Sequence, residues 1–434
     1  ANYSLEEYDK ATDFYTQAMN YTSDNSNLAR LYKGRGDCKH EQFKEEEAIK
    51  DYTKATEYDS NYSDAYRARG LSRVLNFQND LAGADYTSVI NILEKENKKE
   101  NETDLAVLYS DRGEIHWLRS RNDEALADFK ISLSLNPISG FANRKMGDVL
   151  YSLKDYKAAS KYYLQALSLF TKDLDKEIVY KDLSECSRNM LDYAQAVIYI
   201  SEAIKLYPGY GSYYSARGQI YYAKRDYKTS LDDYNKAFAY YEDHKDFIIK
   251  IYGDNMYKNT RMLLYINRAM VKKRLQDNTG ALADFKKATE EDSTSANAWY
   301  HLGRFYKQVL KQNGPALASL QKAIDLSSAK DTTSDYIYAR VIKGDKQEAF
   351  NVAARLIKKE ADNKDRLIRD IYNAACIYAL AGDPVKALQY LDKAFAAGFD
   401  NFDHIYNDED WDSLRSLPAF KAVLTKYKVP QPKL

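Results

Sequence analysis

The stretch YRARG, residues 66–70, places an arginine directly before a glycine on what reads as one face of a helix. The same Arg-Gly dipeptide returns in KGRG at 33–36, in SDRG at 110–113 and in SARG at 215–218. A dipeptide that recurs in similar surroundings indicates an internal repeat, so the spacing between the copies is the first property to establish.

The copies share a register of 34 residues. With Gly36 as position 8 of a unit, Ala48 stands at position 20 and Tyr52 at position 24, and Gly70 and Tyr86 repeat the pattern one unit later. Each unit holds two stretches with apolar residues at helical spacing, and small residues at positions 8, 20 and 27 allow neighbouring helices to approach closely. The sequence therefore predicts a chain of helical hairpins.

The fullest unit contains Trp299, Leu302, Gly303 and Tyr306, in the pattern W-x-x-L-G-x-x-Y. This pattern resembles the tetratricopeptide repeat, and the resemblance covers nearly the whole chain. It implies antiparallel helix pairs stacked into a right-handed superhelix. We expect an all-α fold, an α-solenoid of about ten helix-turn-helix repeats of 34 residues with a C-terminal capping segment.

We expect one repeat solenoid over residues 1–434, interrupted at three places. The charged stretch 94–104 predicts a loop or a helix extension, and 327–335 predicts a flexible joint. The apolar stretch 244–259 packs over adjacent units or docks a partner, and we favour packing. The expected segments are a leading half repeat (1–24), repeats 1–2 (29–96), an insert (97–105), repeats 3–4 (106–173), repeats 5–6 (177–244), a second insert (245–261), repeats 7–8 (262–330), a degenerate repeat 9 (331–367), repeat 10 (368–401), and a C-terminal cap and tail (402–434).

Apolar side chains in the second insert and in the cap need burial. In the insert these are Phe247, Ile248, Ile249, Ile251 and Tyr252. The stretch 396–424 resembles the closing segments of bacterial tetratricopeptide proteins, which cover the last exposed apolar edge of the array. The residues expected to form this cover are Trp411, Leu414, Phe420 and Leu424.

Composition excludes several classes of function. Lys plus Arg and Asp plus Glu both number 64, so the chain lacks the basic excess of a nucleic-acid-binding protein. We see no apolar run long enough to span a bilayer. The chain does not begin with Met, which leaves open whether a leader segment has been removed. The protein is therefore expected to be either cytoplasmic or exported. The oligomeric state is equally open.

The sequence offers little chemistry. The three cysteines, Cys38, Cys186 and Cys376, lie far apart without a CxxC pair, which argues against a disulfide framework and against a zinc site. The histidines are scattered, and phosphate-binding loops and nucleophile elbows are absent. We expect no cofactor, no metal and no enzymatic activity.

Position 7 of five units is Arg, and position 23 of the same five units is Asp. Units without the Arg do not carry the Asp, which suggests a salt bridge between the two helices of one unit. The alternative, arginines that line a ligand surface, leaves the matched Asp unexplained. The predicted pairs are Arg35 with Asp51, Arg69 with Asp85, Arg112 with Asp128, Arg217 with Asp233, and Arg268 with Asp284.

In the family that the repeats resemble, the first helix of each unit lines a concave groove, with side chains at positions 2, 5, 9, 12 and 13 facing it. Position 9 lacks Asn and is often acidic, so we expect the groove to repel a carboxylate tail. The groove candidates are Lys33, Asp37, His40, Arg67, Leu71, Glu114, Trp117, Arg144, Asp148, Tyr151, Lys181, Glu185, Arg188, Tyr222, Tyr300, Arg304 and Lys307.

Basic and acidic rows with aromatic residues between them suit an extended peptide or a partner helix. The alternative is that these rows pair internally and are merely solvated. We expect a non-enzymatic scaffold or adaptor that binds another protein or peptide of unknown identity in the groove. A second hypothesis is a sensor or regulatory module that binds a small ligand or a glycan-like polymer there.

Overall fold

The computed structural model describes residues 2–327, 334–359 and 363–433. Within these ranges it contains 24 α-helices and three short 3-10 helices, and no strand. One isolated bridge joins Asp192 to Lys433. The predicted all-α fold of paired helices is therefore confirmed.

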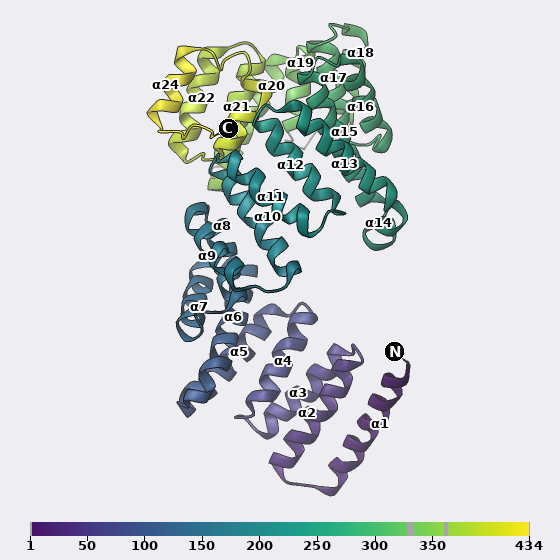
Figure 1. Cartoon of the computed structure of the whole chain (residues 1–434), viewed down its shortest axis with the longest axis vertical. Helices are drawn as coiled ribbons and strands as arrows, with labels where there is room; N and C mark the ends of the chain where they lie inside the picture. The colour runs from purple at the N-terminus through teal and green to yellow at the C-terminus, as the bar shows by residue number, and fades with distance from the viewer. Residues whose placement is uncertain (1, 328–333, 360–362, 434) are drawn as a thin grey trace. The chain divides into compact units, whose positions relative to one another are not determined.

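The chain divides into two compact units, Ala1–Asp175 and Lys176–Leu434. The division falls between the predicted repeats 4 and 5. Figure 1 labels the helices of both units.

Unit 1 is a succession of helix hairpins, purple to blue in Figure 1. Its elements are α1 (Asn2–Ala18), η1 (Met19–Tyr21), α2 (Asn25–Glu41), α3 (Glu45–Tyr58), α4 (Ser63–Leu75), α5 (Asn79–Glu96), η2 (Lys99–Asn101), α6 (Glu102–Leu118), α7 (Asn122–Leu135), α8 (Gly140–Ser152) and α9 (Tyr156–Leu169).

Unit 2 continues the hairpins, and α10 begins just before the boundary. Its elements are α10 (Asp173–Asn189), α11 (Tyr193–Leu206), α12 (Gly211–Ala223), α13 (Tyr227–Asp243), α14 (Lys245–Tyr252), α15 (Asp254–Arg274), α16 (Asn278–Glu291), α17 (Ala296–Gln308), α18 (Asn313–Leu326), α19 (Ser334–Lys343), α20 (Lys346–Lys359), α21 (Lys364–Leu380), α22 (Pro384–Ala397), α23 (Phe402–Asn407), η3 (Glu409–Trp411) and α24 (Pro418–Lys426).

Close packing within each hairpin explains the small residues. A Cβ added to Gly36 on α2 would lie 2.6 Å from a ring carbon of Tyr52 on α3, and one added to Gly147 on α8 would lie 2.6 Å from Tyr163 on α9. Real Cβ atoms do not approach a ring this closely, so these positions require glycine. The alanine predicted at position 20, such as Ala48, is fully buried.

The turn between the two helices of a hairpin has a recurring left-handed residue. L-residues other than Gly, Asn and Asp seldom adopt positive φ, because the Cβ crowds the backbone. In eight hairpins this residue is not glycine: Phe43, Phe77, Ser120, Lys154, Leu191, Arg225, Gln276 and Lys311 have φ between 57° and 65°.

The three predicted interruptions have different outcomes. The helix α5 extends to Glu96 and ends in Asn97, which has φ 49°, and the short η2 then leads into α6. The charged stretch 94–104 thus contains a helix extension and a turn. In the stretch 327–335, residues 328–333 lie outside the described residues.

Only some of the apolar side chains of the second insert pack against neighbouring helices. It forms α14, on which Ile248 is buried and Ile249 is half-buried, whereas Phe247, Ile251 and Tyr252 are each more than half exposed. The prediction that all five side chains pack over the adjacent units is therefore wrong for these three. The helix is only eight residues long, so one face reaches the neighbouring helices and the other faces solvent.

The C-terminal segment covers the last hairpin of unit 2. Trp411, Leu414, Phe420 and Leu424 are all buried, in one cluster with residues of α21 and α22. The indole Nε1 of Trp411 donates a hydrogen bond of 2.9 Å to the hydroxyl of Tyr372 on α21. These contacts anchor the segment that carries the acidic residues Asp408, Glu409, Asp410 and Asp412.

Candidate functional site

The structure brings together the members of all five Arg–Asp pairs. In each pair Nε and Nη2 of the arginine contact the carboxylate, so the contact is a fork. The five aspartates are buried. The shortest nitrogen-to-oxygen distances are 2.6 Å for Arg35–Asp51, 2.7 Å for Arg69–Asp85, 2.7 Å for Arg112–Asp128, 2.7 Å for Arg217–Asp233 and 2.8 Å for Arg268–Asp284.

Each arginine also contacts two groups that sequence reasoning missed. Its guanidinium lies over the ring three residues earlier, as Arg69 does over Tyr66 at 5.1 Å. Its Nη1 donates to a side chain on the second helix of the preceding hairpin, as in the 2.8 Å contact of Arg69 with Thr56. The arginine therefore joins two successive repeats, and a Ser, Thr or Asn on the preceding helix was the signal for this contact.

A second cation shares the carboxylate in several pairs. Arg73 Nη1 lies 2.6 Å from Asp85, and Lys39 and Lys272 contact Asp51 and Asp284 in the same way. Burial lowers the pKa of Arg73, and Asp85 opposes that effect. These buried networks make the matched Arg and Asp residues part of the framework on which the concave surface is built.

In unit 1, most of the charged groove candidates have partners on their own or adjacent helices. On α2, Lys33 pairs with Asp37 at 2.8 Å, and His40 Nδ1 lies 3.0 Å from Glu45. On α4, Arg67 pairs with Asp104 at 3.3 Å. These contacts agree with the alternative that the rows pair internally.

The same holds for the groove candidates farther along unit 1. Lys145 pairs with Glu114 and lies over the ring of Trp117, and Asp148 accepts a 2.9 Å hydrogen bond from Tyr163. Tyr151 packs edge to face on Tyr156. Arg144 is half-buried.

Apolar side chains on the same helices keep their exposure. Leu71 on α4 is 47% exposed, and Leu75, Val107 and Leu118 are about half exposed. All four stand at positions that face the groove in the family that the repeats resemble. Among the described residues of unit 1, the concave surface thus combines paired charges with unburied aliphatic side chains.

In unit 2, the corresponding surface holds a segment of the chain itself. The acidic segment, residues 403–412 on α23 and η3, lies against the first helices of successive hairpins. Arg188 on α10 contacts Asp403 at 3.0 Å, and Tyr222 on α12 donates to Glu409 at 3.3 Å.

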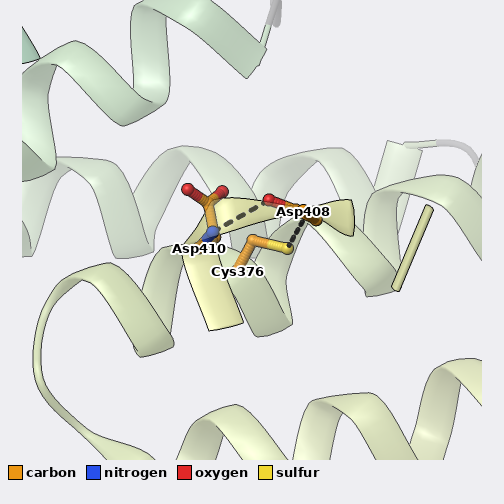
Figure 2. Close-up of side chains that lie close together, drawn as sticks. All are labelled: Cys376, Asp408 and Asp410. Carbon is orange, nitrogen blue, oxygen red and sulfur yellow. Dashed lines mark hydrogen bonds between the residues drawn. The ribbon is translucent and has the colours of Figure 1, made fainter. Parts of the chain in front are cut away.

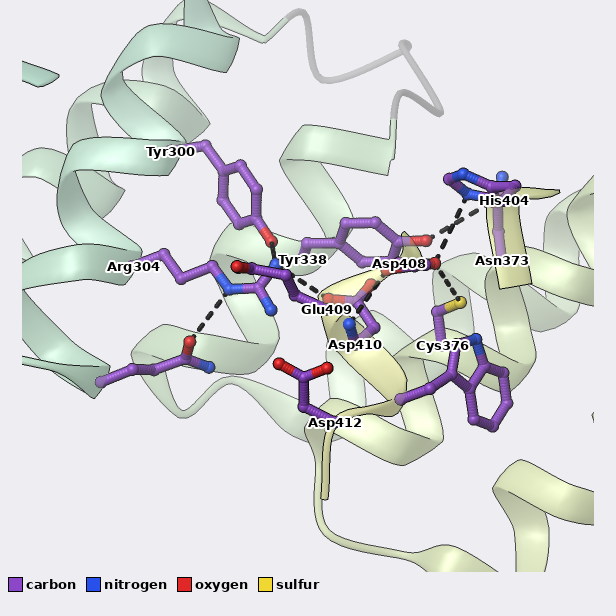
Figure 3. Close-up of polar contacts among 12 residues, drawn as sticks. Tyr300, Arg304, Tyr338, Asn373, Cys376, His404, Asp408, Glu409, Asp410 and Asp412 are labelled. Carbon is purple, nitrogen blue, oxygen red and sulfur yellow. Dashed lines mark hydrogen bonds and ion pairs between the residues drawn. The ribbon is translucent and has the colours of Figure 1, made fainter. Parts of the chain in front are cut away.

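The contacts continue on the next two first helices. From α15, Lys273 lies 2.7 Å from Glu409 and Arg274 lies 2.9 Å from Asp412. From α17, Arg304 lies 2.8 Å from Asp410, and its guanidinium also donates to the hydroxyl of Tyr300 (Figure 3).

The expectation that the groove repels carboxylates is therefore wrong for unit 2. The cations that hold the acidic segment stand at positions 9, 12 and 13, and the acidic position 9 that motivated the expectation belongs mainly to unit 1. The other groove candidates of this unit lie beside the segment or outside it: Glu185 pairs with Arg188 at 2.6 Å, Lys181 is exposed beside Asp182, and Lys307 donates to Asn313.

The acidic segment is deeply buried where it crosses α17 and α21. Burial raises the pKa of Glu409, but Lys273 and the nearby arginines overcome this and leave the pKa of Glu409 below its usual value. Burial and then the charge of Asp408 raise the pKa of Asp410 to about 7, and Arg304 opposes that rise. Two adjacent carboxyl groups of one segment thus have pKa values shifted in opposite directions.

Cys376 on α21 lies close to Asp408 and Asp410 at the start of η3, a grouping that their spacing in the sequence did not indicate (Figure 2). The Sγ of Cys376 donates to Asp408 at 3.5 Å, as does the hydroxyl of Tyr372 at 2.9 Å. Burial raises the pKa of the Cys376 thiol well above its usual value, and Arg304 occupies Asp410. A metal needs a deprotonated thiolate and open carboxylates, so these residues fit a hydrogen-bonded network better than a metal site.

A pocket of about 330 Å³ lies in unit 2 beside the acidic segment. Its lining combines apolar surface, from residues such as Ala223 and Met270, with polar groups from Arg188, Gln219, Tyr222, Asn267, Asp403 and Asn407. No helix in the described part of the chain is both long enough and apolar enough to cross a membrane.

The hairpins, their Gly-to-ring seams and the concave row of first helices define an α-solenoid of helix-turn-helix repeats. The family model described as tetratricopeptide repeat matches residues 29–62 and 145–173. Over these residues the chain contains tetratricopeptide repeats, and the helix pairs elsewhere in the described residues have the same hairpin form. Proteins of this family generally mediate protein–protein interactions.

Similar proteins extend the comparison. The chain is 27% identical over 206 residues to the cell division cycle protein 16 homolog of Homo sapiens, covering 46% of this chain and 32% of that protein. It is 24% identical over 323 residues to the TPR repeat-containing protein MJ1428 of Methanocaldococcus jannaschii, covering 70% of this chain and 52% of that protein. The chain thus spans about a third and about half of these relatives.

Among solved structures, the C-terminal part of a TPR repeat-containing protein from Cytophaga hutchinsonii matches with a TM-score of 0.50 at 17% identity. The match covers 62% of this chain and 98% of that one. At this identity the likeness concerns the fold alone.

Proposed function

We propose that the protein is a non-enzymatic scaffold or adaptor that binds an extended peptide or a partner helix on the concave surface of unit 1. The observation that carries the proposal is the acidic segment of unit 2. It lies along four successive first helices, and the side chains that contact it stand at the groove positions: Arg188 on α10, Tyr222 on α12, Lys273 and Arg274 on α15, and Arg304 on α17. This solenoid therefore already holds one polypeptide segment in the manner proposed for a partner.

The two concave surfaces favour different segments. The charged rows of unit 1 pair internally, so they offer a partner little. Burial of the exposed aliphatic side chains against a partner would supply most of the free energy of binding; these are Leu71, Leu75, Val107 and Leu118. A partner segment with apolar anchors, such as an amphipathic helix, fits this surface better than a strongly charged tail.

A displayed library of random peptides, selected on the full chain, tests the proposal. Leu71→Glu and Leu118→Glu should abolish binding of the selected peptides, because a charge would be buried against an apolar anchor. Leu164→Glu is the matched control, since Leu164 on the second helix α9 is 46% exposed. Peptides that bind equally well to the Leu71 and Leu118 variants would contradict the proposal.

The pocket of unit 2 supports a second candidate, the binding of a small polar ligand. Its lining offers an arginine, two asparagines and a tyrosine hydroxyl within about 330 Å³. Calorimetric titration with short oligosaccharides, on the chain as it is and with Asn267→Ala, separates this candidate from the first. Heat that saturates and disappears in the variant supports it, and absence of heat at millimolar ligand rejects it for this ligand class.

A further inference from the structure

Two phenylalanines in successive hairpins of unit 1 are displayed to solvent by the backbone itself. Phe43, between α2 and α3, is 88% exposed, and Phe77, between α4 and α5, is 92% exposed. Both have positive φ, 59° and 57°, a conformation that a bulky L-residue adopts at a cost. Neither ring contributes to a core, so folding does not explain a phenylalanine at either position.

The same turn position is occupied in unit 2, which shows what such a turn binds. Leu191, with φ 60°, is fully buried, in a cluster against which Phe402 and Tyr406 of α23 pack, and the C-terminal tail bonds to its backbone. The amide of Lys433 donates to the carbonyl of Leu191 at 2.8 Å, and the amide of Tyr193 donates to the carbonyl of Lys433 at 3.1 Å. The Lys433 side chain pairs with Asp192 at 2.9 Å.

The C-terminal segment thus uses three features of the turn: α23 packs on the cluster of its apolar side chain, and the tail bonds to the carbonyl of the left-handed residue and to the amide that begins the next helix. The first amides of a helix have no acceptor inside the helix, so an extended segment can supply one. Pro430 and Pro432 in the tail favour an extended backbone before binding.

The same backbone groups are present in the turn between α2 and α3 and in the turn between α4 and α5, where no described segment of the chain binds them. Among the described residues, the carbonyls of Phe43 and Phe77 and the amides of Glu45 and Asn79 have no hydrogen-bond partner. The residue equivalent to Asp192 is Lys44 in the first turn, where its ammonium makes only a 3.9 Å contact with Asp9. A segment that binds here as the tail binds at Leu191 would therefore place an acidic residue where the tail has Lys433.

We propose that the turn edge of unit 1, formed by Phe43 and Phe77, docks an extended, proline-containing segment of a partner protein with an acidic residue opposite Lys44. The surface is the edge of the hairpins and not their concave face, so the inference is independent of the groove function. The partner segment adds one strand-like bridge to each turn, and apolar side chains beside the bridge cover the phenylalanine ring.

Two synthetic peptides test the proposal on the full chain by fluorescence anisotropy. One has the tail sequence of residues 427–434, YKVPQPKL, and the other, YKVPQPEL, has Glu in place of Lys433. We expect the Glu peptide to bind at least about tenfold more tightly, and Lys44→Glu to reverse the preference. Phe43→Ala and Phe77→Ala should each weaken binding about tenfold, whereas Phe14→Ala, which removes a ring 70% exposed on α1, should not.

Backbone pairing has its own readout, since hydrogen exchange at the amides of Glu45 and Asn79 should slow when the Glu peptide binds. The proposal is overturned if neither peptide binds saturably up to about 1 mM. It is equally overturned if Phe14→Ala has the same effect as Phe43→Ala. Equal or tighter binding of the Lys peptide would also reject it, and would assign the edge to the tail of a second copy of this chain.

Discussion

The first helices of the two units form surfaces of the same kind, but among the described residues only the surface of unit 2 is covered by a segment of the chain itself. In unit 2 the first helices carry cations that contact the acidic segment of the chain itself. In unit 1 the charges are neutralised by neighbours on adjacent helices, and aliphatic side chains keep their exposure. The difference indicates that the repeat sets where the groove side chains stand, whereas the local charges decide what lies against them: the chain's own acidic segment in unit 2 and neighbouring side chains in unit 1.

The largest expected effect comes from removing the anchor of the acidic segment. Trp411→Ala deletes a fully buried indole and its hydrogen bond to Tyr372, which should destabilise unit 2 by about 3–5 kcal/mol. Denaturant unfolding measures the loss. If the variant keeps wild-type stability, the segment is not anchored as described and the contrast between the units fails.

A framework pair should give the next largest effect. Asp85→Ala leaves the buried Arg69 and the half-buried Arg73 without their carboxylate, and should cost about 2–4 kcal/mol. Adding Arg69→Met should restore part of the lost melting temperature, and adding Arg73→Met as well should restore more. Simply additive losses in the double variant would show that the residues do not interact.

How much of this could be read from the sequence depends on distance along the chain. Gly36, Tyr52 and the Arg35–Asp51 pair recur at fixed spacing within one repeat, so counting positions finds them. The contact of Arg304 with Asp410 joins residues of a repeat to residues of the non-repeating end, and no periodicity links them. The one available signal was compositional: residues 403–412 are rich in Asp and Glu, and the first helices of repeats 5–8 carry the matching cations.

The exposed side chains of α14 were missed for a different reason. An apolar run of that length predicts burial, but a single helix of eight residues can bury only one face. Likewise, the left-handed turn residue was invisible because it has no common side chain: Phe43, Lys154 and Gln276 share a backbone conformation and little else.

A smaller effect is expected from pH. The pKa of Asp410 is raised to about 7 in the folded chain, so the folded state holds a proton that the unfolded state has lost between about pH 4 and pH 7. This group therefore lowers stability as pH rises through that window. Asp410→Asn should raise the melting temperature by a few degrees at pH 8 and by less at pH 5.

The pKa of Glu409 is shifted in the opposite direction from that of Asp410, so Glu409 is the control for this prediction. Its lowered pKa means that it stabilises the fold above its unfolded value and loses that contribution only as pH falls below it. Between pH 5 and pH 8 it stays charged, so Glu409→Gln should lower the melting temperature at both values. If Asp410→Asn raised the melting temperature by the same amount at pH 5 and at pH 8, the claim that Asp410 titrates between these values would be contradicted.

The smallest effect belongs to a surface pair of unit 1. Arg119 pairs with Asp80 at 2.6 Å, but both side chains are about half exposed. Arg119→Gln should change the free energy of unfolding by no more than about 1 kcal/mol, and less in high salt. A loss as large as that of Asp85→Ala would show that burial does not distinguish the framework pairs from surface ones.

Hydrogen–deuterium exchange across residues 402–414 tests the central claim most directly. If the acidic segment fills the concave surface of unit 2, its amides should exchange as slowly as those of α21, and Arg304→Glu should accelerate them while the other hairpins stay protected. Exchange of the segment at the rate of a free peptide, in a chain whose repeats are protected, would contradict the account.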